Sequence, residues 1–319
     1  MRFFLIVFKK IGIFIIFLIV CLVLSILSRE FLTISNLINI ARQASILIIV
    51  STGLTLVMIN GGIDLSIGSV AGLSGAILGY FMDTIKIDLG ISLFVALLIA
   101  LLIGILVGLL NGFVITKTGI APFIITLAGL TIYRGVVYLI TRGRPIHNIS
   151  STLTNIGRNY FFKLPIIVWI AIIFIVIFHI ILSYTLDGIR IRQIGTNKEA
   201  AAFNGINVNK YTVLTYAISS LMASIGGILL FGRLNAAAPN AGNGYELDII
   251  AAIVIGGGSL SGGVGTIWGT AIGVLITTII RNGLNLLNIN VFWQYIATGL
   301  IIVFAVIIDS YRKKIEEKI

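Results

Sequence analysis

Apolar residues run along this chain in long blocks, each separated from the next by a short polar stretch. The blocks fall near residues 11–28, 44–60, 63–82, 88–110, 120–141, 164–186, 210–232, 246–260, 265–287 and 291–309. A helix that crosses a bilayer needs about 20 mostly apolar residues, and inside hydrocarbon it satisfies its own backbone groups. The pattern predicts an all-α integral membrane protein: one domain over residues 1–319 with about ten transmembrane helices, the shorter ones broken or re-entrant.

One polar segment, at about residues 188–209, interrupts this pattern. From Gly195 to Ile206 it reads Gly-Thr-Asn-Lys-Glu-Ala-Ala-Ala-Phe-Asn-Gly-Ile. The composition indicates a short helix with small side chains on one face and a glycine stop at Gly205. Small residues let a partner approach the backbone, and the charges of Lys198 and Glu199 would orient it. We therefore expect a docking helix for a water-soluble partner at the membrane face, with an ordinary loop as the plainer alternative.

Composition and charge narrow the class of protein further. Of the 319 residues, 58% are hydrophobic and only 10% are charged, which leaves no room for a soluble catalytic or nucleic-acid-binding domain. In a polytopic protein, the net charge of +11 reflects cytoplasmic Lys and Arg and attraction to anionic lipid. Cys21 is the single cysteine, so no disulfide framework exists.

The distribution of Lys and Arg predicts which way the chain is inserted. With ten spans and both basic termini inside, more Lys and Arg fall on the inner side than on the outer side. This arrangement places the polar segment 188–209 in the cytoplasm.

Two pairs of motifs suggest that the halves of the chain are related. Asn60-Gly61 lies shortly before Asp64, as Asn243-Gly244 lies before Asp248, and Asn111-Gly112 is echoed by Asn282-Gly283. Both echoes are offset by five spans, which would make a five-plus-five inverted repeat, a common transporter architecture. Asn-Gly pairs are also frequent turn formers, so the signal is weak.

Ionisable residues inside apolar blocks are the first candidates for a functional site, because burying them in a bilayer is costly. Asp64, Arg134 and Asp248 are such residues, and with the polar Ser66 and Asn111 they form the candidate translocation pathway. Asp64 stands where the helix of block 63–82 would begin, so it could instead act as a helix N-cap. A binding role and snorkelling remain alternatives for Arg134.

Glycines fall into two patterns. Gly104, Gly108 and Gly112 recur at four-residue spacing, which predicts one helix face that packs closely on a neighbour. The cluster Gly256–Gly265 disfavours continuous helix and predicts a break on the cytoplasmic side. It lacks the Lys-Ser/Thr of a phosphate-binding loop, so we expect no nucleotide there.

Side chains for metal binding or covalent catalysis are not grouped in this sequence. The two histidines and one cysteine show no ligand spacing, and no Gly-x-Ser-x-Gly motif with triad partners is present. We expect neither an enzyme nor a bound cofactor or metal.

Several stretches, taken together and in this order, resemble the permease subunits of ATP-binding-cassette importers for ribose, xylose, galactose and related sugars. The resemblance spans about residues 35–309, and the stretches that carry it are Gly61–Ser69, Gly119–Leu127, Arg134-Gly135 with Pro145-Ile146, Gly195–Ile206 and Glu246–Gly263. It implies a homodimeric pore in the bacterial cytoplasmic membrane, a cytoplasmic ATPase pair that binds the ATP, and an extracytoplasmic sugar-binding protein. It also implies that the docking segment couples the pore to the ATPase through the residues Gly195, Asn197, Glu199, Ala200, Ala201 and Gly205.

A rival interpretation is a secondary transporter driven by protons or sodium, for which Asp64 and Asp248 would supply a pair of buried carboxylates. A membrane assembly protein without transport activity would explain the apolar blocks but not the docking segment. The sequence leaves the identity of the transported sugar open.

Overall fold

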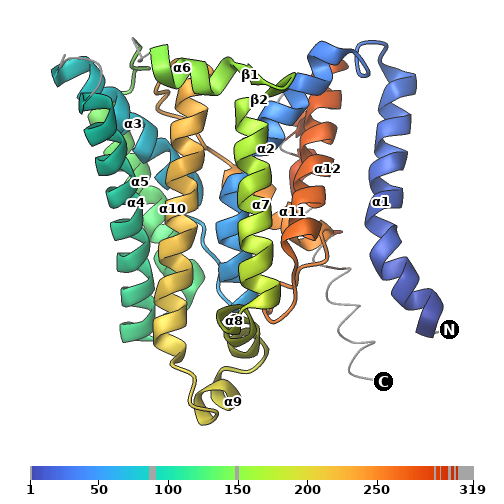
Figure 1. The fold of residues 1–319 in the computed structure, drawn as a ribbon, viewed down its shortest axis with the longest axis vertical. Helices are drawn as coiled ribbons and strands as arrows, with labels where there is room; N and C mark the ends of the chain where they lie inside the picture. Colours follow the sequence, from blue (N-terminus) through green and yellow to red (C-terminus); the bar gives the residue numbers. More distant parts are fainter. Residues whose placement is uncertain are drawn as a thin grey trace.

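The computed structural model describes residues 2–85, 91–147, 151–290, 292–294, 296–300, 303–304 and 307, and these residues form a bundle of helices (Figure 1). The elements in chain order are α1 (Arg2–Leu27), α2 (Ile34–Ile59), α3 (Ile67–Ile85), α4 (Ile91–Thr118), α5 (Pro122–Thr141), α6 (Ser151–Arg158), β1 (Tyr160–Phe161), β2 (Leu164–Pro165), α7 (Ile166–Tyr184), α8 (Leu186–Thr196), α9 (Lys198–Phe203), α10 (Val208–Leu234), α11 (Tyr245–Ile255) and α12 (Ile267–Leu286).

Six helices in the described part of the chain are long and apolar enough to cross a membrane: the spans Ile34–Ile59, Leu93–Thr118, Pro122–Thr141, Ile166–Tyr184, Val208–Leu234 and Ile267–Leu286. Shorter apolar stretches occupy Ile13–Leu27 and Ile67–Met82. The first nine predicted blocks each overlap a helix, whereas block 291–309 falls largely outside the described residues. The helical class is confirmed, while the count of ten and the inverted repeat stay predictions.

Helix α11 shows why apolar composition alone overestimates the number of spans. The block predicted over 246–260 forms a helix of only 11 residues, which ends at Ile255 with Gly256 as its C-cap. At 1.5 Å per residue it is about 16 Å long, half the thickness of the hydrocarbon core. The predicted break at Gly256–Gly265 is therefore present, and it shortens the helix before it.

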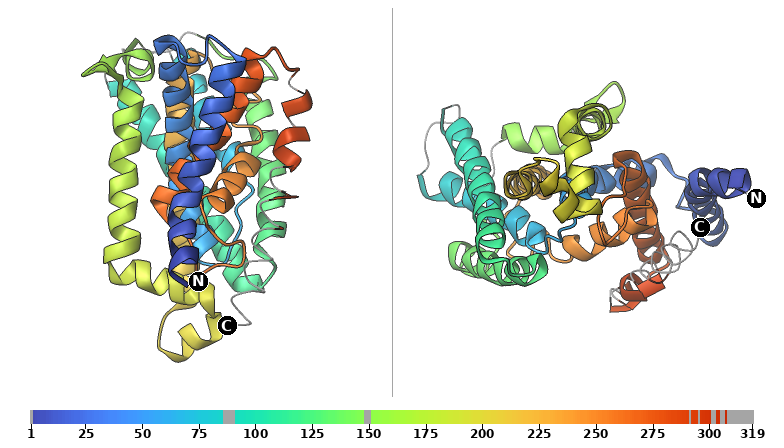
Figure 2. Two further views of the ribbon diagram at one scale, coloured as in Figure 1. Left: turned by 90° about the vertical axis from the view of Figure 1, so that its right-hand side faces the viewer. Right: turned by 90° about the horizontal axis from the view of Figure 1, so that it is seen from below.

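The bundle has two distinct ends. Helices α8 and α9 project at one end, and α6 with the β1–β2 hairpin covers the other (Figure 1). Viewed from the α8–α9 end, α4 and α1 lie at opposite sides of the bundle (Figure 2). In the topology that the charges predict, the α8–α9 end faces the cytoplasm.

The centre of the bundle is α10, which packs on α4, α2 and α3. The predicted glycine face of α4 makes this packing close. A Cβ on Gly104 would collide with the side chain of Ser224 on α10. A Cβ on Gly108 would collide with the backbone of Tyr216 and Ala217, and one on Gly112 with the backbone of Val213. The expectation that these glycines serve helix packing is confirmed.

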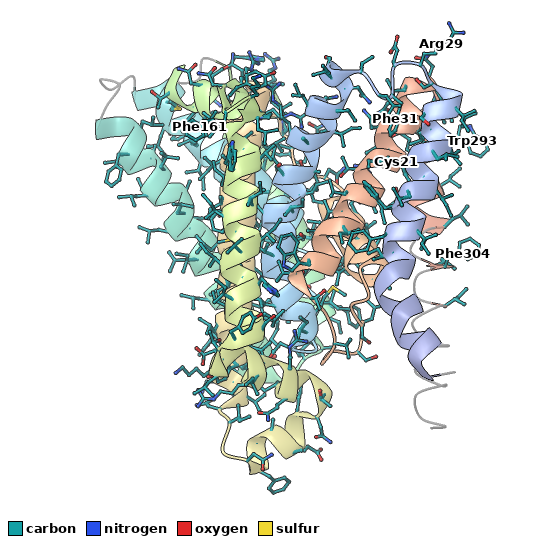
Figure 3. The ribbon with its side chains drawn as sticks, turned by 45° about the vertical axis from the view of Figure 1, so that its right-hand side comes forward. Cys21, Arg29, Phe31, Phe161, Trp293 and Phe304 are labelled. Carbon is teal, nitrogen blue, oxygen red and sulfur yellow. The ribbon has the colours of Figure 1, made fainter. Side chains whose placement is uncertain are left out.

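Helix α2 begins ten residues earlier than the apolar block 44–60, because the polar residues in its first turns have partners. Thr33 caps it by accepting the backbone N–H of Asn36. The amides of Asn36 and Asn282 exchange two hydrogen bonds, of 3.0 and 2.8 Å, and so join α2 to α12. Next to this pair, Phe31 packs with Leu24 of α1, which lies at the edge of the bundle (Figure 3).

Candidate coupling surface and buried polar network

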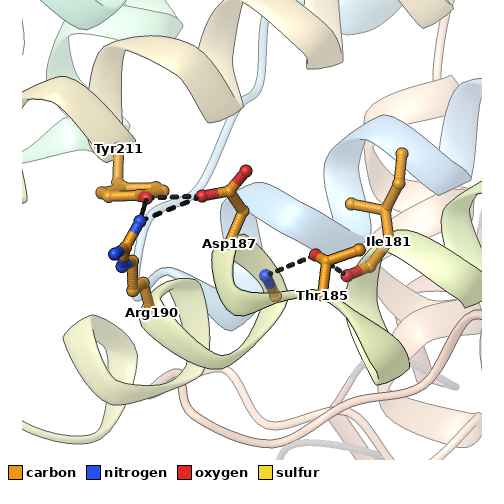
Figure 4. A network of polar contacts seen from close by, with 6 residues as sticks. Ile181, Thr185, Asp187, Arg190 and Tyr211 are labelled. Carbon is orange, nitrogen blue, oxygen red and sulfur yellow. Dashed lines mark hydrogen bonds and ion pairs between the residues drawn. The ribbon is translucent and has the colours of Figure 1, made fainter.

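Helix α8 is fixed to the bundle by a cluster of polar contacts (Figure 4). Thr185 caps it by accepting the N–H of Gly188. The Tyr211 hydroxyl on α10 donates to the Asp187 carboxylate at 2.6 Å and accepts from Arg190 at 2.8 Å. Hydrogen bonding and charge from Tyr211, and then from Asp187, raise the pKa of Arg190 above its ordinary value. These contacts set the angle at which α8 leaves the bundle.

Helix α9 is short, but both of its ends are capped by side-chain and backbone bonds. The Asn197 side chain accepts the N–H of Ala200 at 2.9 Å. At the other end Gly205 has φ +78°, its N–H donates to Ala202, and the N–H of Ile206 donates to Ala201. This pair of bonds is the Schellman arrangement, which needs a left-handed residue at the glycine position. The predicted glycine stop is confirmed.

The surface that α9 presents to solvent is mixed in character. Ala201 is only 2% exposed and faces the bundle, whereas Lys198, Glu199 and Ala200 are exposed. Phe203 at the tip is 92% exposed, an unusual position for a phenylalanine outside the lipid. A groove lies between α8 and α9, and its lining includes Ile189, Arg192, Gln193, Thr196, Asn197 and Ala200. An exposed phenylalanine is of the aromatic type that protein interfaces enrich, whereas the lysine and glutamate beside it are not.

Gly195 is one of the predicted coupling residues, and the structure places it on the inner side of α8. A Cβ there would overlap the carbonyl oxygen of Ile59 and lie 2.5 Å from the backbone nitrogen of Gly263. Of the six predicted coupling residues, Asn197 and Gly205 shape α9, and Glu199 and Ala200 lie on its open face. Ala201 and Gly195 instead pack inward.

A second polar region lies inside the bundle, around the segment that links α2 to α3. Asp64 is completely buried. One carboxylate oxygen accepts the backbone N–H of Ser66 at 3.0 Å and its hydroxyl at 2.6 Å. The other oxygen accepts the Ser219 hydroxyl of α10 at 2.9 Å. Ser219 lies 11 residues into α10, about 16 Å along that helix, so Asp64 lies near the middle of this candidate membrane span.

The network extends to two further helices. The Asn111 amide of α4 donates to the Ser66 hydroxyl at 3.1 Å, and the Tyr133 hydroxyl of α5 donates to Asn111 at 2.7 Å. We call Asp64, Ser66, Asn111, Tyr133 and Ser219 the Asp64 network. The sequence pointed to the first three residues, and the structure brings them together. The sequence did not indicate Tyr133 and Ser219, because neither carries a charge. Their hydrogen bonds to Asn111 and Asp64 depend on how the helices pack.

The sequence offered Asp64 as a helix N-cap, but Asp64 does not stand at the N-cap position of α3. Helix α3 begins at Ile67, so Ser66 stands before the first helical residue. Asp64 accepts the N–H of Ser66 itself, two residues on, which closes a side-chain turn before the helix. Its second oxygen makes a tertiary contact, which a cap does not require.

The other two pathway candidates lie elsewhere. Arg134 donates to the carbonyls of Pro239 and Ala241 at 3.0 and 2.7 Å. Asp248, in the first turn of α11, forms an ion pair of 2.7 Å with Arg281 of α12. Asp64 and Asp248 therefore have different partners, and they do not form the carboxylate pair that a proton-coupled carrier would use.

Comparison with known proteins places the chain among permeases. A family model described as "Branched-chain amino acid transport system / permease component" matches residues 36–306. The chain belongs to this permease family. It is therefore a transport component and a multi-pass protein of the bacterial cytoplasmic membrane.

Individual relatives in this family are named as permeases for particular sugars. The chain is 41% identical to the ribose import permease protein RbsC of Bacillus subtilis, over 97% of this chain and 94% of the relative. It is 38% identical to RbsC of Escherichia coli K12, over 91% and 90%. It is 35% identical to the L-arabinose transport system permease protein AraH of the same strain, over 97% and 92%. No solved structure matches the chain significantly.

Proposed function

We propose that this chain is the membrane-spanning subunit of an ATP-binding-cassette importer that carries a monosaccharide of the ribose type into the cytoplasm. The relatives that cover nearly the whole chain support the sugar class, since their names specify ribose and arabinose. The observation that carries the ATP-driven mechanism is the α8–α9 segment. It is a capped helix that projects from one end of the bundle with Phe203 exposed at its tip.

The partners follow from this mechanism. A cytoplasmic ATPase binds α9, with Glu199, Ala200 and Phe203 as contacts, and holds the ATP, so the permease itself needs no cofactor. A second permease copy completes the pore, and an extracytoplasmic sugar-binding protein delivers substrate to the end that carries α6. The Asp64 network, Arg134 and Asp248 are proposed to line or gate the polar path between the two ends.

Reconstitution tests this proposal. The permease is placed in proteoliposomes with its ATPase and binding protein, and uptake of labelled ribose, xylose, arabinose and galactose is measured with ATP, without ATP, and with an imposed proton gradient. We expect uptake only with ATP and strongest for a pentose. Uptake driven by a proton gradient in vesicles that lack the ATPase would show a secondary transporter instead.

A further inference from the structure

Three segments that are far apart in the sequence meet at the α8–α9 end through glycine backbones. They are the turn after α2, the end of α8 and the loop between α11 and α12. The N–H of Gly263 donates to the carbonyl of Ile59 at 2.8 Å. A Cβ on Gly61 would lie 3.6 Å from the Cα of Gly195. We call Gly61, Gly195, Gly262 and Gly263 the glycine junction.

At Gly195 and Gly262 the glycine junction leaves no space for a side chain. A Cβ on Gly262 would lie 2.7 Å from the carbonyl oxygen of Gly195 and 2.8 Å from the Cα of Gly61, closer than Cβ atoms come to backbone. A Cβ on Gly195 would overlap the Ile59 carbonyl. These neighbours are backbone atoms and cannot rotate away. Because close-packed backbone transmits displacement with little compliance, the three segments are held as one unit.

Each segment of the glycine junction leads directly to a different functional element. Gly61 stands three residues before Asp64. The loop that holds Gly262 and Gly263 connects α11, with Asp248, to α12, with Arg281. Gly195 stands two residues before Asn197, the N-cap of α9. The end of α8 that leads into the docking helix α9 therefore contacts both the turn after α2 and the α11–α12 loop at the glycine junction.

We propose that the glycine junction is the rigid contact through which movement of α8–α9 displaces the Asp64 segment and the α11–α12 loop together. This inference rests on the proposed ATP-driven function. Gly195 is then a positioning residue of the transport cycle rather than a contact of the ATPase. A change that forces the segments apart should leave the ATPase bound but disconnect its hydrolysis from transport.

The variant Gly195→Ala tests this role, with Gly135→Ala as the matched control. Gly135 is also helical, but a Cβ there would meet nothing within 4 Å. We expect Gly195→Ala to retain ATPase co-purification and basal ATP hydrolysis while sugar carried per ATP falls about tenfold, because overpacking at a rigid contact shifts the backbone. Gly135→Ala should match the wild type. An unchanged ratio of sugar to ATP in Gly195→Ala would overturn the proposal. Loss of ATP-dependent uptake in the wild type would instead defeat the proposed function.

A second measurement applies even if Gly195→Ala fails to reach the membrane. Hydrogen exchange of the Gly263 amide is followed in the wild-type complex, both free of nucleotide and trapped with ATP. A rigid junction keeps the bond from Gly263 to Ile59, so exchange should stay equally slow in both states. A rise of about tenfold or more in the trapped state would show that the segments separate during the cycle, and it would refute the rigid contact.

Discussion

The α8–α9 segment and the Asp64 network are both polar regions in an apolar protein, but they differ in how far their polar groups are hydrogen-bonded within the chain. In α9 the bonds are local and satisfy only the helix ends, while Glu199, Lys198 and Phe203 remain open to solvent. In the network each oxygen of Asp64 has a donor within the bundle, from α10 or from its own segment. The Asp64 network is therefore satisfied within the chain, whereas α9 leaves charged and apolar side chains exposed to solvent.

This contrast separates two kinds of mutational effect. A buried carboxylate that loses a donor has no water to replace it, so changes in the Asp64 network should lower stability. An exposed helix that loses a contact or a cap stays solvated, so changes in α9 should affect the partner interaction more than the fold. Stability and ATPase binding, measured side by side on the same variants, therefore distinguish the two regions.

Asp64→Leu should produce the largest loss of stability. The leucine leaves the Ser219 hydroxyl and both donors of Ser66 without an acceptor, and we expect a loss of about 3 kcal/mol in unfolding free energy. Asp64→Asn keeps the shape and an accepting oxygen and should cost about 1 kcal/mol. Thermal unfolding of the purified permease in detergent measures both. Equal stability of the leucine and asparagine variants would contradict the structural role of the network.

Ser219→Ala and Ser220→Ala form a matched pair on α10. Both serines are completely buried, but Ser219 donates to Asp64, whereas the Ser220 hydroxyl has no hydrogen-bond partner in the described structure. Loss of the Ser219 donor leaves a buried oxygen of Asp64 without its partner, which predicts a loss of about 2 kcal/mol for Ser219→Ala, against close to zero for Ser220→Ala. The same unfolding assay compares them, and equal losses would show that Asp64 does not depend on Ser219.

Gly205→Pro should weaken the ATPase interaction with little effect on the bundle. Proline cannot donate to Ala202 and cannot adopt φ +78°, so the last turn of α9 must change. We expect co-purification of the ATPase to fall about tenfold, while Gly205→Asn, which tolerates a left-handed conformation, stays near the wild-type level. Proline and asparagine variants that bind the ATPase equally well would remove α9 from the coupling site.

Tyr211→Phe should give the smallest effect and tests the attachment of α8. It removes the hydroxyl between Asp187 and Arg190, a loss of about 1 kcal/mol at most, because that cluster is partly exposed. Its signature should be a modest decrease in sugar carried per ATP with unchanged membrane levels. A loss of stability as large as that of Ser219→Ala would mean that this cluster belongs to the core rather than to the coupling segment.

The sequence predicts what depends on local residues and misses what depends on helix packing. The glycine stop at Gly205, the break at Gly256 and the polar candidates Asp64, Ser66 and Asn111 follow from residue type and spacing. Their convergence on Ser219 and Tyr133 does not, since nothing in the spacing of α5 or α10 indicates which residues face Asp64. Gly195 illustrates the same limit, because its contact with Ile59 depends on a segment 136 positions earlier in the sequence.

The most direct test of the central claim, that α9 binds an ATPase, places a photo-crosslinking phenylalanine analogue at position 203 in the intact complex. A second permease carries the analogue at Phe161, which is also exposed but lies in the hairpin at the opposite end. We expect a crosslink from position 203 to the ATPase subunit, identified by its sequence, and none from position 161. Capture of the ATPase from position 161, or failure at position 203 in a complex that hydrolyses ATP and carries sugar, would contradict it.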